Sequence, residues 1–481
     1  MFVSLLIMRT MLQPEGAVNV LLRNIGLIAS DASLPFFTDA TWARVTVIII
    51  NIWVGVPYTL LQLTGVLQNI PEELYEAAKV DGANAFQTFT KITLPYMLYV
   101  TTPYLIVTFT GNVNNFNVIY LLSGGDPVTN LSSTAGKTDL LVTWLYKLTI
   151  DKQYYNIGAV IGIMTFIILA IGALFTYRNS KSYKEEGGFL IMAGKKLQSA
   201  KKKKMINNTI VHIVLAVLAI IWLFPIAWVI LTSFRAEKGS YVSTFFPKAF
   251  TLDNYIKLFT DTSILNFPQM FMNTLFIAIC SCILSAFYVL AVSYCLSRLK
   301  FKMRKPYMNM AMILGLFPGF MSMIAVYFIL KAMGLTEGSL IKLALILCYS
   351  GGAGLGFQIA KGFFDTIPVA IDEAALLDGC TRWQIFSRIT LPLSKPIIVY
   401  TVLTSFMAPW LDFIFAKVIC RANSDQYTIA IGLWKMLEKE YIDSWYTSFA
   451  AGAVLISIPI AILFLFMQRY YVDGVSGAVK G

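Results

Sequence analysis

Two stretches of this chain, residues 70–95 and 367–392, repeat one sequence pattern 297 positions apart. They align without a gap and share 13 of 26 residues. Each contains Glu-Ala-Ala, three further residues, a glycine, nine further residues and then Ile-x-Leu-Pro. Because a repeat of this kind indicates two related structural units, we expect the chain to fold into two homologous halves.

The chain is far more apolar than a soluble protein of 481 residues. Hydrophobic residues make up 57% of it and charged residues 13%, and the mean hydropathy is +0.68. A helix needs roughly 20 apolar residues to cross a bilayer, and runs of this kind recur along the sequence. We therefore predict an all-α, polytopic membrane helical bundle. The nine predicted spans are 44–64, 98–122, 156–177, 209–232, 271–296, 306–330, 340–360, 396–419 and 448–468, while the N-terminal run FVSLLIM is too short to cross.

Lysine and arginine are concentrated in particular loops. The segment 178–208 and the turn 297–305 are strongly basic, whereas loops 123–153 and 420–447 are nearly balanced in charge. By the positive-inside rule, the two basic segments are cytoplasmic and the balanced loops are external. Counting spans from these anchors places both repeated loops in the cytoplasm. The net charge of +12 thus reflects membrane topology, and we expect no nucleic-acid partner.

The residues that most often bind metals are sparse and unclustered. The six cysteines lack the spacing of a metal site, and four of them lie inside predicted spans, where free cysteines act as small apolar side chains. The single histidine, His212, begins a span beside cytoplasmic lysines. We therefore predict no metal site and no cofactor.

The two halves are of unequal length. When the 297-residue offset is applied, only the last three spans of the chain have full counterparts in the first half. We predict a unit at 1–177 that is truncated at its N-terminus, with three full spans and a short remnant. A basic cytoplasmic linker follows at 178–208, and a complete six-span unit occupies 209–481. Met192, before a lysine-rich run, resembles the start of a separate protein, so gene fusion, read-through or an error in gene prediction would each account for the join.

Each repeated loop is expected to form a compact helix-turn-helix knob. Leu74, Ala77 and Ala78 share one helical face, and Gly82 can adopt the left-handed conformation that ends a helix. Small alanines permit close approach to a partner, and a glutamate offers it a charge-assisted hydrogen bond. The alternative is a loop that packs only against the spans. The residues singled out here are Glu76, Ala77, Ala78 and Gly82 in the first copy and Glu373, Ala374, Ala375 and Gly379 in the second.

The pattern E-A-A-x3-G-x9-I-x-L-P resembles the signature of the permease subunits of bacterial binding-protein-dependent ABC importers. Residues 112–127 (NVNNFNVIYLLSGGDP) and 135–142 (AGKTDLLV) resemble the larger permease of maltose and maltodextrin importers. Residues 209–481, with TSFRAEKGS and PWLDF, resemble its smaller partner. The resemblance thus implies the tail of the larger subunit joined to the whole of the smaller one, as two type I ABC importer transmembrane units.

The same resemblance implies a setting and partners. It implies a multi-pass protein of the bacterial plasma (inner) membrane, whose loops 67–97 and 361–395 carry coupling helices that insert into ATPase subunits. An extracytoplasmic sugar-binding protein would deliver the sugar. An intact permease is a further candidate partner, and membrane lipid surrounds the spans.

Polar side chains inside a predicted span indicate a cavity or a partner. The span 98–122 contains four asparagines, of which Asn112 and Asn115 would share a helical face and could hydrogen-bond sugar hydroxyls. The resemblance places the sugar site in the first copy, at these positions, with Asn51 and Tyr58 as neighbours. The alternative is hydrogen bonding between helices. Asp412 lies at the position equivalent to Asn115, where we expect pairing with Trp410 or nearby backbone.

These features favour an importer permease that carries a sugar, most simply maltose or maltodextrin, by alternating access. Gly136, Lys137 and Thr138 resemble the end of a phosphate-binding loop, but the preceding glycine is missing. We therefore expect no ATP hydrolysis by this chain and assign it to a separate subunit. The alternatives are a permease for another carbohydrate, a secondary carrier and a membrane scaffold.

Overall fold

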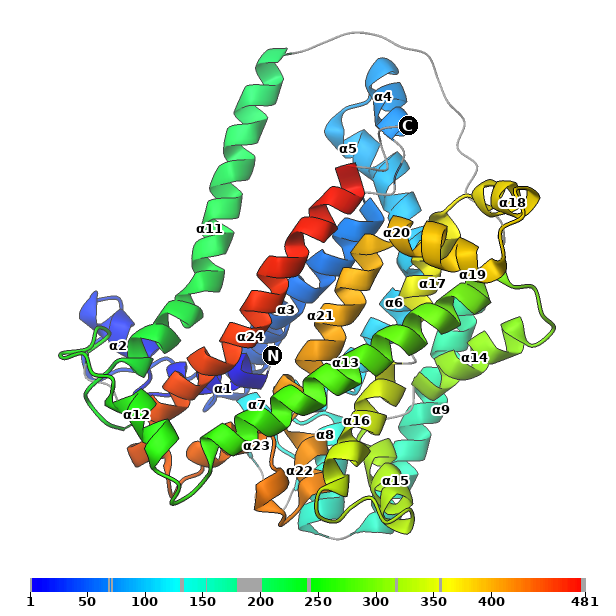
Figure 1. The fold of residues 1–481 in the computed structure, drawn as a ribbon. Coiled ribbons are helices and arrows are strands. Elements are labelled where there is room, and N and C mark those ends of the chain that lie inside the picture. Colours follow the sequence, from blue (N-terminus) through cyan, green and yellow to red (C-terminus); the bar gives the residue numbers. More distant parts are fainter. Residues whose placement is uncertain are drawn as a thin grey trace.

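The computed structural model of the protein describes residues 2–67, 70, 72–129, 134–152, 154–179, 201–239, 244–315, 319–353 and 357–476. Apart from one antiparallel bridge between Arg235 and Phe250, the regular structure of these residues is helical. The helices form one elongated bundle (Figure 1). The predicted all-α fold is therefore confirmed.

The first half contains three long helices connected by short ones. The long helices are α3 (Ala40–Leu67), α6 (Leu94–Val113) and α9 (Tyr155–Asn179). The short elements are α1 (Phe2–Met11), α2 (Ala17–Asn24), α4 (Glu72–Val80), α5 (Ala85–Thr88), the π-helical turn η1 (Phe89–Thr93), α7 (Phe116–Leu122), α8 (Leu141–Tyr146) and η2 (Lys147–Asp151).

The second half is longer and has more breaks. Its long helices are α11 (Lys201–Ser233), α13 (Phe267–Arg298) and α24 (Ile442–Ser476). Between them lie α12 (Asp253–Thr260), α14 (Arg304–Gly315), α15 (Gly319–Ala332), α16 (Leu340–Ala353), α17 (Phe357–Thr366), α18 (Val369–Leu377), α19 (Arg382–Ile385), η4 (Phe386–Thr390), α20 (Leu391–Leu393), α21 (Lys395–Leu411), α22 (Ile414–Cys420), η5 (Ser424–Gln426) and α23 (Ile429–Met436).

Single long helices account for five of the nine predicted spans in the part of the chain that is described. These are Ala40–Pro57, Asn156–Thr176, His212–Ser233, Phe267–Arg298 and Ile442–Gln468. Two further predicted spans are divided within described residues: 98–122 is split into α6 and α7, and 396–419 into α21 and α22. The predicted spans 306–330 and 340–360 each include residues outside the described ranges. Hydropathy averaged over a window does not detect such a break. The apolar helices still make the chain a multi-pass membrane protein.

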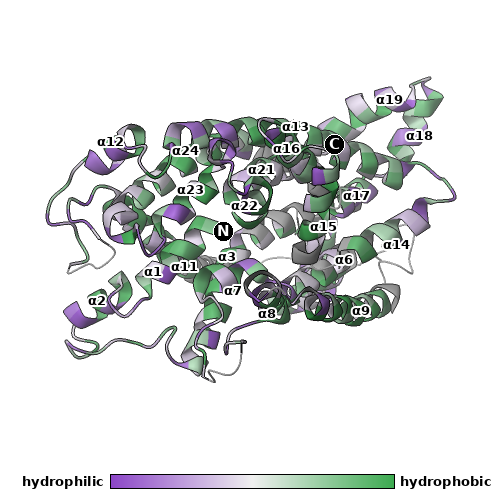
Figure 2. Cartoon of the chain, turned by 90° about the horizontal axis from the view of Figure 1, so that it is seen from below, coloured by the Kyte–Doolittle hydropathy of each residue, from purple (hydrophilic) through white to green (hydrophobic). Residues whose placement is uncertain are grey.

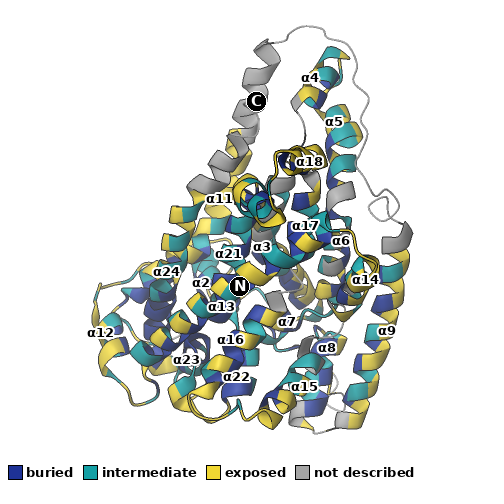
Figure 3. Ribbon diagram, turned by 45° about the vertical axis from the view of Figure 1, so that its right-hand side comes forward, coloured by how far each residue is buried: buried dark blue, intermediate teal, exposed yellow. Residues whose placement is uncertain are grey.

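One hydrophobic core joins the two halves. It includes the short helix α1, whose Phe2, Leu5, Leu6 and Met11 are each exposed by 1% or less. The ring of Phe2 stacks on Phe413 from the second half, with centroids 5.6 Å apart. Figure 3 shows the buried residues gathered in the middle of the bundle. Helix α1 is only ten residues long, and it fills the core between the halves.

The outer helices expose apolar side chains, as lipid contact requires. On α9 the exposed residues include Ile163, Ile167, Ile168, Ile171 and Phe175. Viewed along the bundle, α9 is apolar along its length (Figure 2). In a bilayer these side chains would contact acyl chains, so their exposure is compatible with a stable protein.

Both repeated loops lie at the same end of the bundle, where α4 and α18 project, and α12, α22 and α23 lie at the opposite end (Figure 1). Two loops that both lie in the cytoplasm must be at the same end of the bundle, so this arrangement agrees with the predicted topology. Residues 180–200 of the predicted linker lie outside the described residues, and the rest of it, from Lys201, already belongs to helix α11.

The buried position of α1 generates a test of the core. Replacing Leu5 by Ala should destabilise the protein by about 2–5 kcal/mol, because it leaves a cavity between packed helices. The measurement is the thermal unfolding midpoint of detergent-purified protein. Leu27→Ala is the matched control, because Leu27 is 69% exposed. Equal midpoints for the two variants would contradict the packing described here.

Candidate functional site

The two repeated loops share one backbone conformation. Helix α4 ends before Gly82, which has φ +74°, and α18 ends before Gly379, which has φ +80°. The amide of Ala83 donates to the carbonyl of Ala78 at 2.9 Å, and Cys380 donates to Ala375 at the same distance. This six-residue closure with a left-handed glycine is a Schellman motif. The left-handed conformation predicted for Gly82 is therefore confirmed, and its counterpart Gly379 adopts it too.

A capping box begins the second helix of each loop. In the first copy, Asn84 and Gln87 exchange side-chain-to-backbone hydrogen bonds, both of 2.9 Å. In the second copy, Thr381 and Gln384 do the same at 2.7 and 3.3 Å. These bonds satisfy amides that have no partner inside a helix. Because the bonds of the turn and of the cap join near neighbours, the local sequence determines the conformation of each loop.

The exposed surface of the loops differs in part from the prediction. Glu76 and Glu373 are exposed, as a role in docking requires. Ala78 and Ala375, however, are each only 6% exposed, because they face inward against their own chain. The expectation that these two alanines approach a partner is therefore wrong, whereas Ala77 is partly exposed and Ala374 fully so.

Large aromatic side chains are exposed at equivalent positions of the loops. Phe86 is 74% exposed, and Trp383, which lies 297 positions later, is 67% exposed. Leu377, at the end of α18, is 90% exposed. Exposed apolar groups beside polar ones are typical of interaction sites. Sequence reasoning did not select these residues, although their shared place in the repeat was a signal for them.

The second loop is fastened to α13 by a buried ion pair. Arg298 Nε lies 3.2 Å from Asp372 Oδ2, and both side chains are almost completely buried. Arg298 Nη2 also donates to the carbonyl of Ile367 at 2.9 Å. Removing one partner of a buried ion pair leaves an uncompensated charge. Loop and helix are therefore expected to move together.

The first loop has a different attachment. Tyr75 occupies the position of Asp372, and its hydroxyl lies 3.2 Å from Thr93 Oγ1 within the same loop. The exit from the loop also differs, since η1 continues directly into α6. In the second copy the helix bends by 83° before α21. Pro396, which stands where the first copy has Tyr99, cannot donate a helical hydrogen bond and explains this break.

The predicted asparagines meet at a break between α6 and α7. Asn51 on α3 donates to Asn112 Oδ1 at 2.8 Å, and Asn115 donates to Asn51 Oδ1 at 3.0 Å. Asn112 also donates to the carbonyl of Thr108 at 2.9 Å. Asn51, Asn112 and Asn115 therefore form one hydrogen-bonded network, called here the asparagine triad.

The triad does not have the geometry expected from sequence. Asn115 begins a new helix, where its Oδ1 accepts the amide of Val118 at 3.3 Å, so it does not share a helical face with Asn112. Tyr58 lies within α3, but its side chain lies outside the described residues. Asn112 is exposed, and an asparagine carries two donors and an oxygen acceptor. The triad can thus hold helices together and still offer hydrogen bonds to a ligand.

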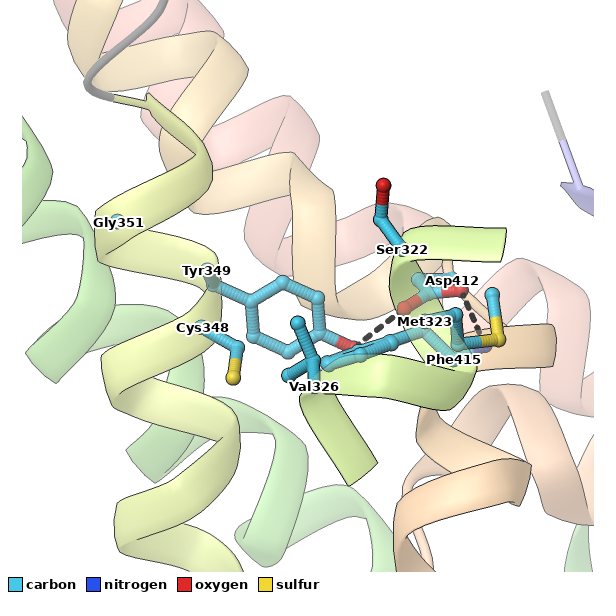
Figure 4. Close-up of a pocket in the computed structure, with 8 residues that line it drawn as sticks. All are labelled: Ser322, Met323, Val326, Cys348, Tyr349, Gly351, Asp412 and Phe415. Atoms are coloured by element: carbon cyan, nitrogen blue, oxygen red, sulfur yellow. Dashed lines mark hydrogen bonds between the residues drawn. The ribbon is translucent and has the colours of Figure 1, made fainter. Parts of the chain in front are cut away.

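Asp412 is the counterpart of Asn115 at the break between α21 and α22. Its Oδ1 accepts the amide of Phe415 at 3.1 Å, and its Oδ2 accepts the hydroxyl of Tyr349 at 2.8 Å (Figure 4). The expected backbone partner is thus present. Of the two expected kinds of partner, the backbone is therefore the one present, since the buried Trp410 Nε1 has no hydrogen-bond partner among the described residues. Tyr349 was missed, since a donor on another span leaves no local signal.

The segments 112–127 and 135–142 lie against each other. Lys137 donates its amide to the carbonyl of Pro127 at 3.0 Å, and Thr138 Oγ1 donates to the carbonyl of Asp126 at 2.7 Å. A Cβ on Gly136 would lie 2.0 Å from the carbonyl oxygen of Gly125. Gly136 is therefore explained by close packing of two chain segments.

Comparison with known proteins gives a consistent result. Residues 1–184 and 288–477 match the family described as "Binding-protein-dependent transport system inner membrane component". The galactooligosaccharides transport system permease protein GanQ of Bacillus subtilis (strain 168) is 32% identical over 287 residues, which are 59% of this chain and 100% of GanQ. The maltodextrin transport system permease protein MdxG of the same organism is 32% identical over 284 residues, 59% of this chain and 100% of MdxG.

A further relative is matched over a smaller share of its length. The galactooligosaccharides transport system permease protein GanP of Bacillus subtilis (strain 168) is 47% identical over 153 residues, which are 32% of this chain and only 36% of GanP. A solved bacterial ABC transporter involved in the import of the acidic polysaccharide alginate is 20% identical, with a TM-score of 0.45, over 57% of this chain and 100% of that one.

The left-handed glycines generate a second test. Gly82→Ala and Gly379→Ala should each weaken the loop by about 1 kcal/mol, roughly fivefold in its opening equilibrium, because alanine disfavours positive φ. An added Cβ at either position meets nothing within 4 Å, so the effect comes from the backbone alone. Hydrogen exchange at the amides of Ala83 and Cys380 measures it. Gly172→Ala, in α9 with equally open space, should leave these amides unchanged. Unaltered exchange in the loop variants would contradict the role of the turns.

Proposed function

Because the chain belongs to the family of binding-protein-dependent transport system inner membrane components, we propose that it forms the transmembrane path of an ATP-driven sugar importer. The observation that supports this most is the pair of loops with one backbone conformation, both at the same end of the bundle (Figure 1). Two equivalent knobs suit a two-fold arrangement of ATPase subunits. Sugar would pass by alternating access, and ATP would be hydrolysed on those separate subunits.

We assign the coupling role to the exposed parts of both loops. Glu76 and Glu373 would form charge-assisted hydrogen bonds to the ATPase, and Phe86 and Trp383 would supply apolar contact area. Gly82 and Gly379 shape each knob, together with the inward-facing alanines Ala78 and Ala375. Ala77 and Ala374 lie beside the glutamates and leave room for a close approach.

We assign sugar binding to the asparagine triad, with Tyr58 as a neighbour on α3. Three amides linked by hydrogen bonds of 2.8 and 3.0 Å form a preorganised polar surface. Sugar hydroxyls both donate and accept hydrogen bonds, and amides offer both kinds of partner. An external sugar-binding protein would deliver the ligand from the side opposite the loops.

The proposed substrate is a maltodextrin, and a galactooligosaccharide is the second candidate. The resemblance of residues 112–127 to maltodextrin permeases supports the first. The 47% identity with GanP, described as a galactooligosaccharides permease, favours the second. Competition between the two sugars for uptake separates these candidates, since the better ligand inhibits at the lower concentration.

We also propose that 1–177 and 209–481 correspond to two permease subunits joined through the segment 178–208. The match to GanQ covers 59% of this chain and that to GanP 32%, and these shares support the idea. An intact permease remains a candidate partner of the first unit.

Reversing charge on both loops tests the coupling assignment. Glu76→Arg combined with Glu373→Arg should reduce sugar uptake and capture of the ATPase subunit at least about tenfold, because cations replace hydrogen-bond acceptors at a docking surface. Uptake into cells and co-purification from native membranes measure the two effects.

The control carries the same change of charge elsewhere. Glu337→Arg with Glu440→Arg alters two exposed glutamates outside the loops and should leave uptake and capture intact. If the wild-type chain transports sugar while retaining no ATPase, a secondary carrier replaces the importer. If the wild-type chain neither transports sugar nor retains an ATPase, the membrane scaffold replaces the importer as the proposed function.

Replacing Asn112 by Leu tests the sugar assignment. The change removes hydrogen bonds to Asn51 and to the ligand but leaves Asn115 to cap α7, so the fold should persist. We expect the KM for maltotriose uptake to rise at least about tenfold, while capture of the ATPase stays unchanged.

Asn117→Leu provides the matched control, because Asn117 is an exposed asparagine outside the triad. It should transport sugar like the wild type. Normal uptake by Asn112→Leu would mean that the triad serves helix packing alone.

A further inference from the structure

A cavity of about 470 Å³ lies in the second half, beside the break between α21 and α22. Met323 and Val326 of α15 and Tyr349 of α16 line it, together with Asp412 and Phe415 at the break. Figure 4 shows Tyr349 directed across this space toward the Asp412 carboxylate. A carboxylate in an apolar cavity of a membrane bundle marks a functional site.

The carboxylate retains capacity to accept another hydrogen bond. Tyr349 donates to Oδ2, and the amide of Phe415 donates to Oδ1. Each carboxylate oxygen has about two lone pairs, so Oδ2 can accept a second donor. No ion pair of Asp412 occurs within the described ranges. A ligand with hydroxyl groups would supply such a donor.

The cavity also has the position of two of the three triad residues. Under the 297-residue offset, Asp412 corresponds to Asn115 and Cys348, which also lines the cavity, corresponds to Asn51. Asn115 and Asp412 each accept the amide three residues later, at 3.3 and 3.1 Å. In both halves the equivalent helix is therefore interrupted, and a side-chain oxygen at the break caps the helix that follows.

Stacked aromatic rings connect the two breaks. Phe116 stacks on Tyr120 with centroids 5.0 Å apart, and Tyr120 stacks on Trp434 at 5.9 Å. Trp434 in turn stacks on Phe413 at 4.7 Å, next to Asp412. The breaks thus belong to one packed layer of the bundle.

We propose that this cavity is a second sugar subsite, which binds a neutral pyranose ring of the transported oligosaccharide. The proposal rests on the proposed function. Asp412 would accept a sugar hydroxyl in a charge-assisted hydrogen bond. Phe415, Met323 and Val326 would cover the apolar face of the ring, as in other pockets with few polar groups.

The composition of the cavity disfavours a metal ion as its ligand. A bound Ca²⁺ takes six to eight oxygen ligands. The side-chain oxygens at the cavity wall come only from Ser322, Tyr349 and Asp412 among the described residues. Those residues also contain no group of three or more metal-ligating side chains.

The natural thiol in the cavity wall provides the first experiment. In a chain whose other five cysteines are replaced by alanine, Cys348 is alkylated with N-ethylmaleimide in membranes that contain the assembled transporter. Maltotriose at ten times its half-saturating concentration should slow alkylation about tenfold, because an occupied cavity excludes the reagent. Gly111→Cys in a chain lacking all native cysteines reports the asparagine triad in the same way, because position 111 is exposed next to Asn112 and an added Cβ there meets nothing within 4 Å.

These two reporters separate the inference from the function on which it rests. Protection of both thiols supports a second subsite. Protection of the thiol at position 111 with unchanged alkylation of Cys348 overturns the subsite and leaves sugar transport standing. Protection of neither, with no uptake of maltotriose or a galactooligosaccharide, overturns both. Protection of Cys348 by sodium ions instead of sugar also overturns the subsite.

A variant of the carboxylate completes the test. Asp412→Asn keeps an oxygen that can accept from the Phe415 amide, and its side-chain nitrogen can donate to the Tyr349 hydroxyl, so the helix break should persist. We expect the KM for maltotriose to rise about tenfold with an unchanged thermal midpoint, because the charge-assisted bond is lost. Asp425→Asn, at an exposed position, should leave the KM unchanged. An unchanged KM for Asp412→Asn would overturn the subsite.

Discussion

Every backbone amide inside an apolar bundle needs a hydrogen-bond partner, and this requirement governs the middle of the structure. Two helices break there, and the amides of Val118 in α7 and Phe415 in α22 would be left unpaired without a side-chain acceptor. Asn115 supplies that acceptor in the first half and Asp412 in the second. The side-chain amide of Asn115 also brings hydrogen-bond donors without a charge, whereas the carboxylate of Asp412 brings a charge and only accepts hydrogen bonds. The same structural solution therefore creates two polar sites of different chemistry.

The polar breaks are held in place by apolar packing. The aromatic stack from Phe116 through Tyr120 and Trp434 to Phe413 crosses from one half to the other, and Phe2 of α1 extends it. Buried aromatic rings contribute large contact areas with defined geometry. A change in the angle of either broken helix would disturb this stack, so the two halves are not free to move independently at this level.

Local sequence predicted the loops much better than it predicted the breaks. A glycine after Glu-Ala-Ala and a capping residue two positions later determine each turn through bonds between near neighbours. The division of span 98–122 was not predicted, because average hydropathy measures the apolar content of a segment and does not show whether its helix is continuous. The bond between Tyr349 and Asp412 joins residues 63 positions apart on different helices, so only the fold reveals it. The inward orientation of Ala78 likewise depended on which helical face the rest of the chain covers.

The two repeated loops share one conformation but are attached to the bundle differently. Movement of each loop would therefore be transmitted along a different route. The first loop continues through η1 into α6, whose 20 residues form a rod of about 30 Å that ends beside Asn112 and Asn115. Movement of this loop would reach the asparagine triad along one helix. The second loop is fixed to α13 through Arg298 and Asp372, and an 83° bend separates it from α21. Its movement would reach Asp412 only after passing through the body of the second half. Under the proposed coupling, movement of the two loops would therefore act directly at the triad and indirectly at the Asp412 cavity.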